Sequence, residues 1–383
     1  MRQVKLLSMA GFIFSFFLYQ LMNGWFFLGR TTTNFGDLNY VVNCGNRSGL
    51  NSNYFSDNGC SGYMYGSLIL RLVEVFGINN QQVYIIGLLF FIGFSVIFSS
   101  LAISSNNRVL SLVVGLIILF SPPVELILQR ANIDALIFIL VYVSSELILR
   151  HKFGYAIFLL SICSLMKFYT LPLLIAISLL YAVKQKKRIR SQVYLVFVLL
   201  ICVIDIKNVS YFPGDAQNFF GAPIFGEYFQ YLIYGPNTHS NLFISGLLGI
   251  LLYWIFCYFF YRLSSVVPVY PSISNVSFNR KPLVLFSMFF FVFASCYLAG
   301  LNIDYRLVFI AVPILTFFNL KIEGGSWFKI PLLLTTFLVL YTSYNTYIFQ
   351  PIGDFFILLL IAYFTVLFLK EISIIISALT TTK

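Results

Sequence analysis

Residues 150–190, RHKFGYAIFLLSICSLMKFYTLPLLIAISLLYAVKQKKRIR, decide how the middle of the chain folds. An apolar run lies between two basic blocks, and Lys167 and Pro172 interrupt it. A single straight helix over this run would exceed the ~30 Å of a bilayer's hydrocarbon core and would separate the two blocks. Because basic segments beside membrane helices stay in the cytoplasm, the pattern predicts two short helices that turn back at a break near Lys167.

The composition agrees with a membrane environment. Hydrophobic residues make up 60% of the chain and charged residues 10%, whereas soluble domains carry about 25% charged residues. The first apolar run, residues 6–28, follows Arg2 and Lys5 and lacks a small-residue cleavage site. We therefore expect a retained first span with the N-terminus in the cytoplasm. The net charge of +11 then reports orientation in the membrane rather than a nucleic-acid partner.

The same rule predicts an all-α, polytopic membrane bundle of about twelve spans, forming a single integral membrane domain over residues 1–383 with both termini in the cytoplasm. The predicted spans are 6–28, 83–103, 109–121, 133–149, 153–166, 170–183, 193–206, 241–261, 282–301, 307–320, 330–344 and 355–369. Most of the 24 Lys and Arg residues then lie inside, and most of the 13 acids lie outside. Abundant Asn, Ile, Phe, Tyr and Lys are typical of an AT-rich bacterial gene, so the predicted location is the bacterial cytoplasmic membrane.

Two longer hydrophilic segments, residues 30–82 and 207–240, lie on the predicted outer side. The first contains YMYGSLILRLVEVFG at 63–77, whose apolar spacing suits a helix lying on the membrane surface. It also contains Cys44 and Cys60, and two cysteines in an oxidising compartment favour a disulfide. No cysteines have metal-ligand spacing, so we expect no metal site built from cysteines.

Polar residues recur where predicted spans begin on the outer side. The triplet Asn-Ile-Asp occurs at 132–134 and again at 302–304. Asn and Asp are preferred helix caps, and an acid near a helix N-terminus is stabilised by the helix dipole. Capping therefore explains Asn132 and Asp134 without any catalytic role.

The cations beside these triplets need another explanation. Arg130 and Arg306 lie at positive helix ends on the outer side, where the dipole and the topology rule both disfavour them. We expect each to meet an anion, either a protein acid such as Asp304 or Glu125 or the phosphate of a ligand. Lys167, at the predicted helix break, is a further candidate for binding an anion.

Asp37 follows the first span by a few residues and permits two interpretations. It caps a turn or the next helix, which is the ordinary role of such an aspartate. Alternatively it is a general base at the membrane surface that takes a proton from a hydroxyl nucleophile. Tyr40, Tyr63 and Tyr65 are close in sequence, and their rings could stack on sugars.

Taken in order, these stretches resemble the glycosyltransferase C superfamily, specifically the polyprenyl-phosphate-sugar-dependent enzymes of glycosyltransferase family 87. The stretches are GDLNYV at 36–41, YMYGSLILRLVEVFG at 63–77, QRANIDALIFIL at 129–140, SLMKFYTLPLLI at 164–175 and NIDYRLVFIAVP at 302–313. The chain departs from the family pattern at Ala131, where glycine is common, and at Gly66, where proline is common.

The resemblance implies an inverting transferase that moves a sugar from a polyprenyl-phosphate donor to a glycan or glycolipid acceptor on the outer face, in assembly of cell-surface polysaccharide or glycolipid. It implies Asp37 as the base. It implies donor-phosphate binding by Lys167, Arg306 and Arg130, and a pocket formed by Tyr40, Tyr65, Asn132, Asp134, Asp304 and Tyr305. No cofactor is expected, and the sequence leaves open whether a divalent ion assists.

Two other functions remain open at this point. An O-antigen-type polymerase would join lipid-diphosphate-linked units on the same face, and segment 207–240 rather than Asp37 would be its main feature. A transporter or flippase would require inverted repeats with ionisable groups at the midplane, whereas the acids here gather on one face. The chain has no Walker loop, dinucleotide fingerprint or large cytoplasmic loop, which argues against cytosolic nucleotide chemistry.

Overall fold

The structure, a computed structural model, consists almost entirely of helices in the part of the chain that it describes. It describes residues 2–25, 34–47, 67–103, 108–185, 195–196, 198–201, 219–220, 242–266, 280–299, 302–319, 326–342, 346–370 and 376. The helical fold class is confirmed for these residues, with one pair of two-residue strands as an addition.

Contacts divide the chain into two compact units. The first comprises Met1–Ile103 and Glu125–Gly214, and the second comprises Ser104–Val124 and Asp215–Lys383. The boundary near residue 124 falls within α7, and the single domain predicted from the sequence stays a prediction.

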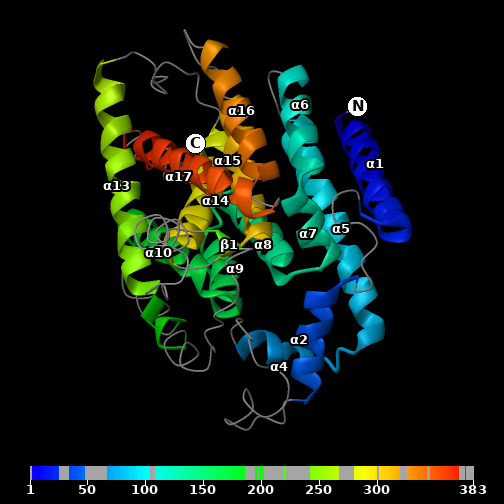
Figure 1. The fold of residues 1–383 in the computed structure, drawn as a ribbon. Coiled ribbons are helices and arrows are strands. Elements are labelled where there is room, and N and C mark those ends of the chain that lie inside the picture. Colours follow the sequence, from blue (N-terminus) through cyan, green and yellow to red (C-terminus); the bar gives the residue numbers. More distant parts are fainter. Residues whose placement is uncertain are drawn as a thin grey trace. The chain divides into compact units, whose positions relative to one another are not determined.

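The elements of both units are drawn in Figure 1. The first unit contains α1 (Arg2–Asn23), α2 (Gly36–Arg47), α4 (Ser67–Val75), α5 (Asn80–Ile103), most of α7 (Pro122–Gln129), α8 (Ile133–Leu149), α9 (Phe153–Met166), the 3-10 helix η1 (Phe168–Thr170) and α10 (Leu171–Gln185). The second unit contains α6 (Arg108–Leu119), β1 (Phe219–Phe220), α13 (Leu242–Val266), α14 (Arg280–Ala299), β2 (Asn302–Ile303), η4 (Asp304–Leu307), α15 (Val308–Asn319), α16 (Ser326–Thr342) and α17 (Thr346–Lys370).

Three described helices are long and apolar enough to cross a membrane, and they indicate a membrane protein. They are Gln3–Asn23, Asn80–Leu101 and Ile352–Leu369, and α7 with α8 adds a fourth if this bent pair counts as one span. Most predicted spans coincide with a helix, but the number that cross the bilayer stays a prediction. Helix α17 begins at Thr346 rather than at residue 355, and it includes the buried Asp354. Most of the predicted span 193–206 lies outside the described residues.

The helical hairpin predicted around Lys167 is confirmed. Helix α9 ends at Met166, and Lys167 adopts an extended conformation with φ −150° before η1 and α10 continue the chain. The rings of Phe153 and Tyr181 stack with their centroids 5.8 Å apart, so the start of α9 lies beside the later part of α10. The ends of the hairpin that adjoin the two basic blocks therefore lie together, as the topology rule requires.

Helices α5 and α8 run in the same direction through the first unit. The rings of Phe94 and Phe138 lie 5.3 Å apart, and further along both helices the hydroxyls of Ser100 and Tyr142 lie 3.0 Å apart. Parallel packing is what the predicted topology requires, because both helices are expected to run from the outside to the inside.

Helix α2 was not predicted, although its apolar residues have helical spacing. Leu38, Val41 and Val42 are buried on one face, and α2 packs beside α4 (Figure 1). A Cβ on Gly45 would lie 2.5 Å from Val73 Cγ1, so this close approach of the two helices requires glycine.

Helix α4 confirms a helix within the predicted stretch 63–77, while residues 63–66 lie outside the described part. Its buried face contains Ile69, Leu70 and Val73, and Arg71 and Glu74 are exposed. This division suits a helix at an interface, and its position on the membrane surface stays a prediction.

In the second unit, side-chain hydrogen bonds connect helices that are distant in sequence. The hydroxyls of Tyr253 on α13 and Thr365 on α17 lie 2.8 Å apart, and the Tyr341 hydroxyl of α16 donates to the carbonyl of Ile117 at 2.9 Å. Strands β1 and β2 pair in antiparallel fashion. This pairing brings residues 219–220 of the second hydrophilic segment beside the second Asn-Ile-Asp triplet.

Candidate active site

Asp37 lies in the first turn of α2, two residues after Phe35, whose side chain is held by packing. Phe35 has φ 61°, which is uncommon for a bulky residue, and its side chain is fully buried. A Cβ on Gly87 of α5 would lie 2.8 Å from Phe35 Cζ, so α5 leaves room for this ring. The carboxylate of Asp37 is favourably placed at the positive end of the α2 dipole.

The segment opposite Asp37 is the α7–α8 corner, residues 129–134. The axes of α7 and α8 differ by 107°. The N–H of Ala131 donates to the carbonyl of Leu128 at 3.0 Å, and the N–H of Asn132 donates to that of Ile127 at 3.1 Å. These bonds form a Schellman motif, in which the left-handed residue is usually glycine. Here it is Ala131, with φ 44°.

Replacing Ala131 by glycine is expected to raise the free energy of unfolding by about 1 kcal/mol. A left-handed conformation costs alanine ~1–2 kcal/mol, and the greater freedom of glycine in the unfolded chain offsets part of the gain. Thermal unfolding in detergent, followed by labelling of the buried Cys163 thiol, measures the change. Ala135→Gly within α8 is the matched control and should lower stability by ~1 kcal/mol. A loss of stability in both variants would contradict the strain at residue 131.

Backbone hydrogen bonds hold α2 against the corner. The N–H of Phe35 donates to the carbonyl of Gln129 at 2.6 Å, and the N–H of Leu38 donates to the carbonyl of Arg130 at 3.3 Å. Amides at the start of one helix thus satisfy carbonyls at the end of another. Asp37 lies between the two donors, so its backbone is positioned by the corner.

The side chain of Asp37 also contacts the corner. Its Oδ1 lies 2.8 Å from Nε of Arg130, and its Oδ2 accepts a hydrogen bond from Nδ2 of Asn132. The exposed fraction is 16% for the Asp37 side chain and 45% for Arg130. The carboxylate is therefore oriented by two donors and remains partly accessible.

Arg130 meets a protein acid, as expected, but this acid is not one of the two that the sequence analysis named. The sequence suggested Asp304, Glu125 or a ligand phosphate, whereas the structure shows Asp37. Glu125 is fully buried and accepts a hydrogen bond from Nε2 of Gln20 on α1 at 3.0 Å. It lies on helix α7.

Asn132 connects Asp37 to the start of α8. Its Nδ2 donates to Asp37, and its Oδ1 accepts from the backbone N–H of Asp134 at 2.9 Å. The predicted capping role is confirmed by this second bond. Asn132 is completely buried, so a change at this residue would affect both Asp37 and the helix.

Asp134 ends this chain of contacts in the interior. Its Oδ1 lies 2.9 Å from Nζ of Lys167 and accepts a hydrogen bond from the Tyr169 hydroxyl at 2.7 Å. The exposed fraction is 0% for Asp134 and 3% for Lys167. We call these six residues, Asp37, Arg130, Asn132, Asp134, Lys167 and Tyr169, the Asp37 cluster.

Five members of the Asp37 cluster were predicted from sequence, and Tyr169 was missed. Its signal was its position two residues after Lys167 at the helix break, where a side chain can turn into the same space. The arrangement also gives the two cations of the Asp37 cluster different surroundings. Arg130 is accessible, whereas Lys167 is sealed beside a carboxylate, and a buried charge of this kind requires its partner.

The remaining predicted site residues are distributed as follows. Tyr40 lies on α2 one turn after Asp37, and burial raises the pKa of its hydroxyl. Asp304, Tyr305 and Arg306 lie on η4 of the second unit, where the Arg306 side chain is buried. Tyr65 lies outside the described residues. The pocket and phosphate-binding roles of these residues stay predictions.

The cysteine prediction is tested in part. Cys44 is buried and disulfide-bonded, whereas its predicted partner Cys60 lies outside the described residues. Cys163, Cys257 and Cys296 are free thiols.

Within the described ranges, no three His, Cys, Asp or Glu side chains gather as metal ligands would. Comparisons of the chain with protein-family models, curated proteins and solved structures give no match.

Proposed function

We propose that the chain is a membrane glycosyltransferase that moves a sugar from a polyprenyl-phosphate donor to a hydroxyl of a glycan or glycolipid acceptor. The observation that carries the proposal is the Asp37 carboxylate. It is partly exposed, lies at a helix start and is oriented by Arg130 and Asn132. A carboxylate held in this way suits a base for a hydroxyl nucleophile.

In the proposed reaction, the acceptor hydroxyl attacks the anomeric carbon while Asp37 takes its proton. The bond between the anomeric carbon and the phosphate oxygen breaks, and its electron pair leaves with the polyprenyl phosphate. A carboxylate has about four acceptor positions. The contacts with Arg130 and Asn132 occupy two of them, one on each oxygen, which leaves room for the acceptor hydroxyl.

The geometry refines the roles of the cations. In an inverting displacement the leaving phosphate lies on the far side of the anomeric carbon from the base. Arg130 touches the base, so its Nε contact orients Asp37 in this proposal. Lys167 balances the buried charge of Asp134 and thereby fixes the start of α8. The phosphate-binding role of Arg306 stays a prediction from its place in the sequence.

The experiment that tests the proposal compares two donors. Purified protein in liposomes receives either a polyprenyl-monophosphate sugar or a lipid-diphosphate oligosaccharide, with a mixture of bacterial glycolipids as acceptor. We expect the monophosphate donor to be consumed and the diphosphate donor to be left intact. Growth of chains from the diphosphate donor alone would instead identify a polymerase and overturn the proposal.

A further inference from the structure

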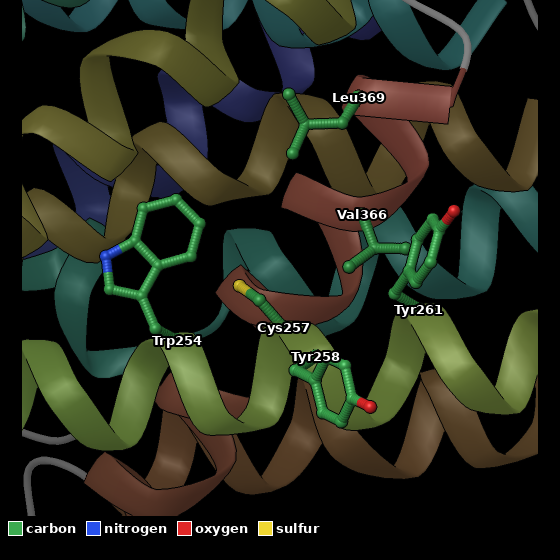
Figure 2. A pocket seen from close by; sticks show the side chains of 6 residues that line it. All are labelled: Trp254, Cys257, Tyr258, Tyr261, Val366 and Leu369. Atoms are coloured by element: carbon green, nitrogen blue, oxygen red, sulfur yellow. The ribbon is translucent and has the colours of Figure 1, made fainter.

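A groove of about 540 Å³ lies between α13 and α17 in the second unit. The side chains that line it are Trp254, Cys257, Tyr258 and Tyr261 of α13 and Val366 and Leu369 of α17. Figure 2 shows Trp254 and Tyr261 at the two ends of the α13 row, with the two α17 side chains above it. The α13 residues have the spacing of one helix face, so one continuous strip forms the floor.

The groove is preformed, and its exposed lining side chains are largely apolar. Behind it, the hydroxyls of Tyr253 and Thr365 lie 2.8 Å apart and connect the two helices. Trp254, Tyr258 and Leu369 are each more than half exposed, and Leu369 ends the candidate span Ile352–Leu369. In a membrane, exposed apolar side chains contact hydrocarbon. A lipid acyl chain therefore matches the chemistry of the groove.

A cation lies at one end of this strip. Arg262 follows Tyr261 and is one helical turn beyond Tyr258 on the same face, and its side chain is exposed. A lipid tail gains little from leaving other tails for an apolar groove. The charge at Arg262 therefore decides which lipid is preferred. The topology predicted from the sequence places Arg262 in the cytoplasmic leaflet, where anionic lipids are concentrated.

We propose that this groove binds an anionic phospholipid, with one acyl chain along the strip from Trp254 to Tyr261 and the phosphate at Arg262. The proposal concerns the second unit and does not depend on the proposed transferase function. One cation near an anionic headgroup contributes ~1 kcal/mol, which corresponds to an approximately fivefold preference over a zwitterionic lipid.

Trp254 gives a direct readout, because the chain has only three tryptophans. With Trp25 and Trp327 replaced by phenylalanine, the full chain is placed in bilayers that contain chain-brominated phosphatidylglycerol or chain-brominated phosphatidylcholine at increasing fractions. Bromine on the acyl chain quenches the fluorescence of a neighbouring indole. We expect phosphatidylglycerol to quench Trp254 with a binding constant about fivefold above that of phosphatidylcholine.

Variants separate a specific site from ordinary surrounding lipid. Arg262→Gln should bring the two binding constants to the same value, and Val366→Phe should reduce quenching by filling the groove. Leu247→Phe, on an exposed part of α13 outside the groove, should change neither quantity. Equal binding constants in the parent protein, or an unchanged preference in Arg262→Gln, would overturn the proposal.

A second measurement covers the case in which Trp25→Phe disturbs the buried Trp25 site. Native mass spectrometry of the unsubstituted chain in mixed vesicles of the two unbrominated lipids should show retained phosphatidylglycerol. Arg262→Gln should lose it. Retention of both lipids in proportion to the vesicle composition would contradict the proposal.

Discussion

Replacing Asp37 by asparagine is expected to lower the rate of sugar transfer by about 10²- to 10⁴-fold, the range that a general base contributes. The amide has nearly the same shape as the carboxylate but cannot take the proton of the acceptor hydroxyl. The lost contact with Arg130 is a partly exposed ion pair, worth about 0–1 kcal/mol. Activity should therefore collapse while the fold is retained. Transfer from a labelled polyprenyl-phosphate sugar and thermal unfolding, measured on the same preparation, give both quantities.

The matched control for Asp37→Asn is Glu74→Gln. Glu74 is an exposed acid on α4 of the same unit, and its replacement makes the same change in charge. It should leave the transfer rate and the unfolding temperature unchanged. Full transfer activity in Asp37→Asn would remove Asp37 from the base role. Equal loss of activity and of stability would show instead that Asp37 only connects α2 to the α7–α8 corner.

Replacing Lys167 by methionine is expected to destabilise the protein by about 3–5 kcal/mol. The change leaves the buried Asp134 carboxylate without its ion-pair partner, and an uncompensated buried charge is costly. The Tyr169 hydroxyl bond to Asp134 remains but does not neutralise the charge. Thermal unfolding in detergent, with labelling of Cys163 as the readout, measures the loss.

The double variant Lys167→Met with Asp134→Asn shows whether charge is the cause. With both charges removed, most of the lost stability should return, because a buried ion pair adds little over neutral groups of similar size. Lys152→Met, at an exposed position at the start of α9, should change stability by no more than about 0.5 kcal/mol. A double variant that is less stable than Lys167→Met would contradict this account of the pair.

The helical hairpin was predictable from sequence because a single rule governs it. Two basic blocks on either side of an apolar run must lie on the same side of the membrane, and Lys167 with Pro172 marks where the run turns. The members of the Asp37 cluster were also predictable as candidates, since cations at positive helix ends require anions. Both arguments rest on the free-energy cost of placing charged groups in the membrane without a partner or on the wrong side.

The pairing within the cluster was not predictable from sequence. Arg130 meets Asp37 and Lys167 meets Asp134 because α2 docks on the α7–α8 corner, and this docking depends on the shape of buried residues such as Phe35. Helices α2 and α7 were missed for a related reason. Both are short, and helices of this length depend on packing against a partner surface that the sequence does not show.

The structure explains why Ala131 is an unusual residue at its position. The residue has φ 44° in the Schellman motif that ends α7, a position that glycine usually occupies. The alanine tolerates the strain because hydrogen bonds on both sides hold the corner. The three polar residues around it, Arg130, Asn132 and Asp134, therefore belong to one turn that caps α8 and orients Asp37.

The most direct test of the proposed function is the stoichiometry of the wild-type reaction. Purified protein in liposomes is supplied with a polyprenyl-phosphate sugar labelled in both the sugar and the phosphate, together with the glycolipid acceptors. The account predicts one polyprenyl phosphate released for each sugar transferred, with inversion at the anomeric carbon. Absence of release above the level seen without protein, in a preparation that is folded by thermal unfolding, would contradict it.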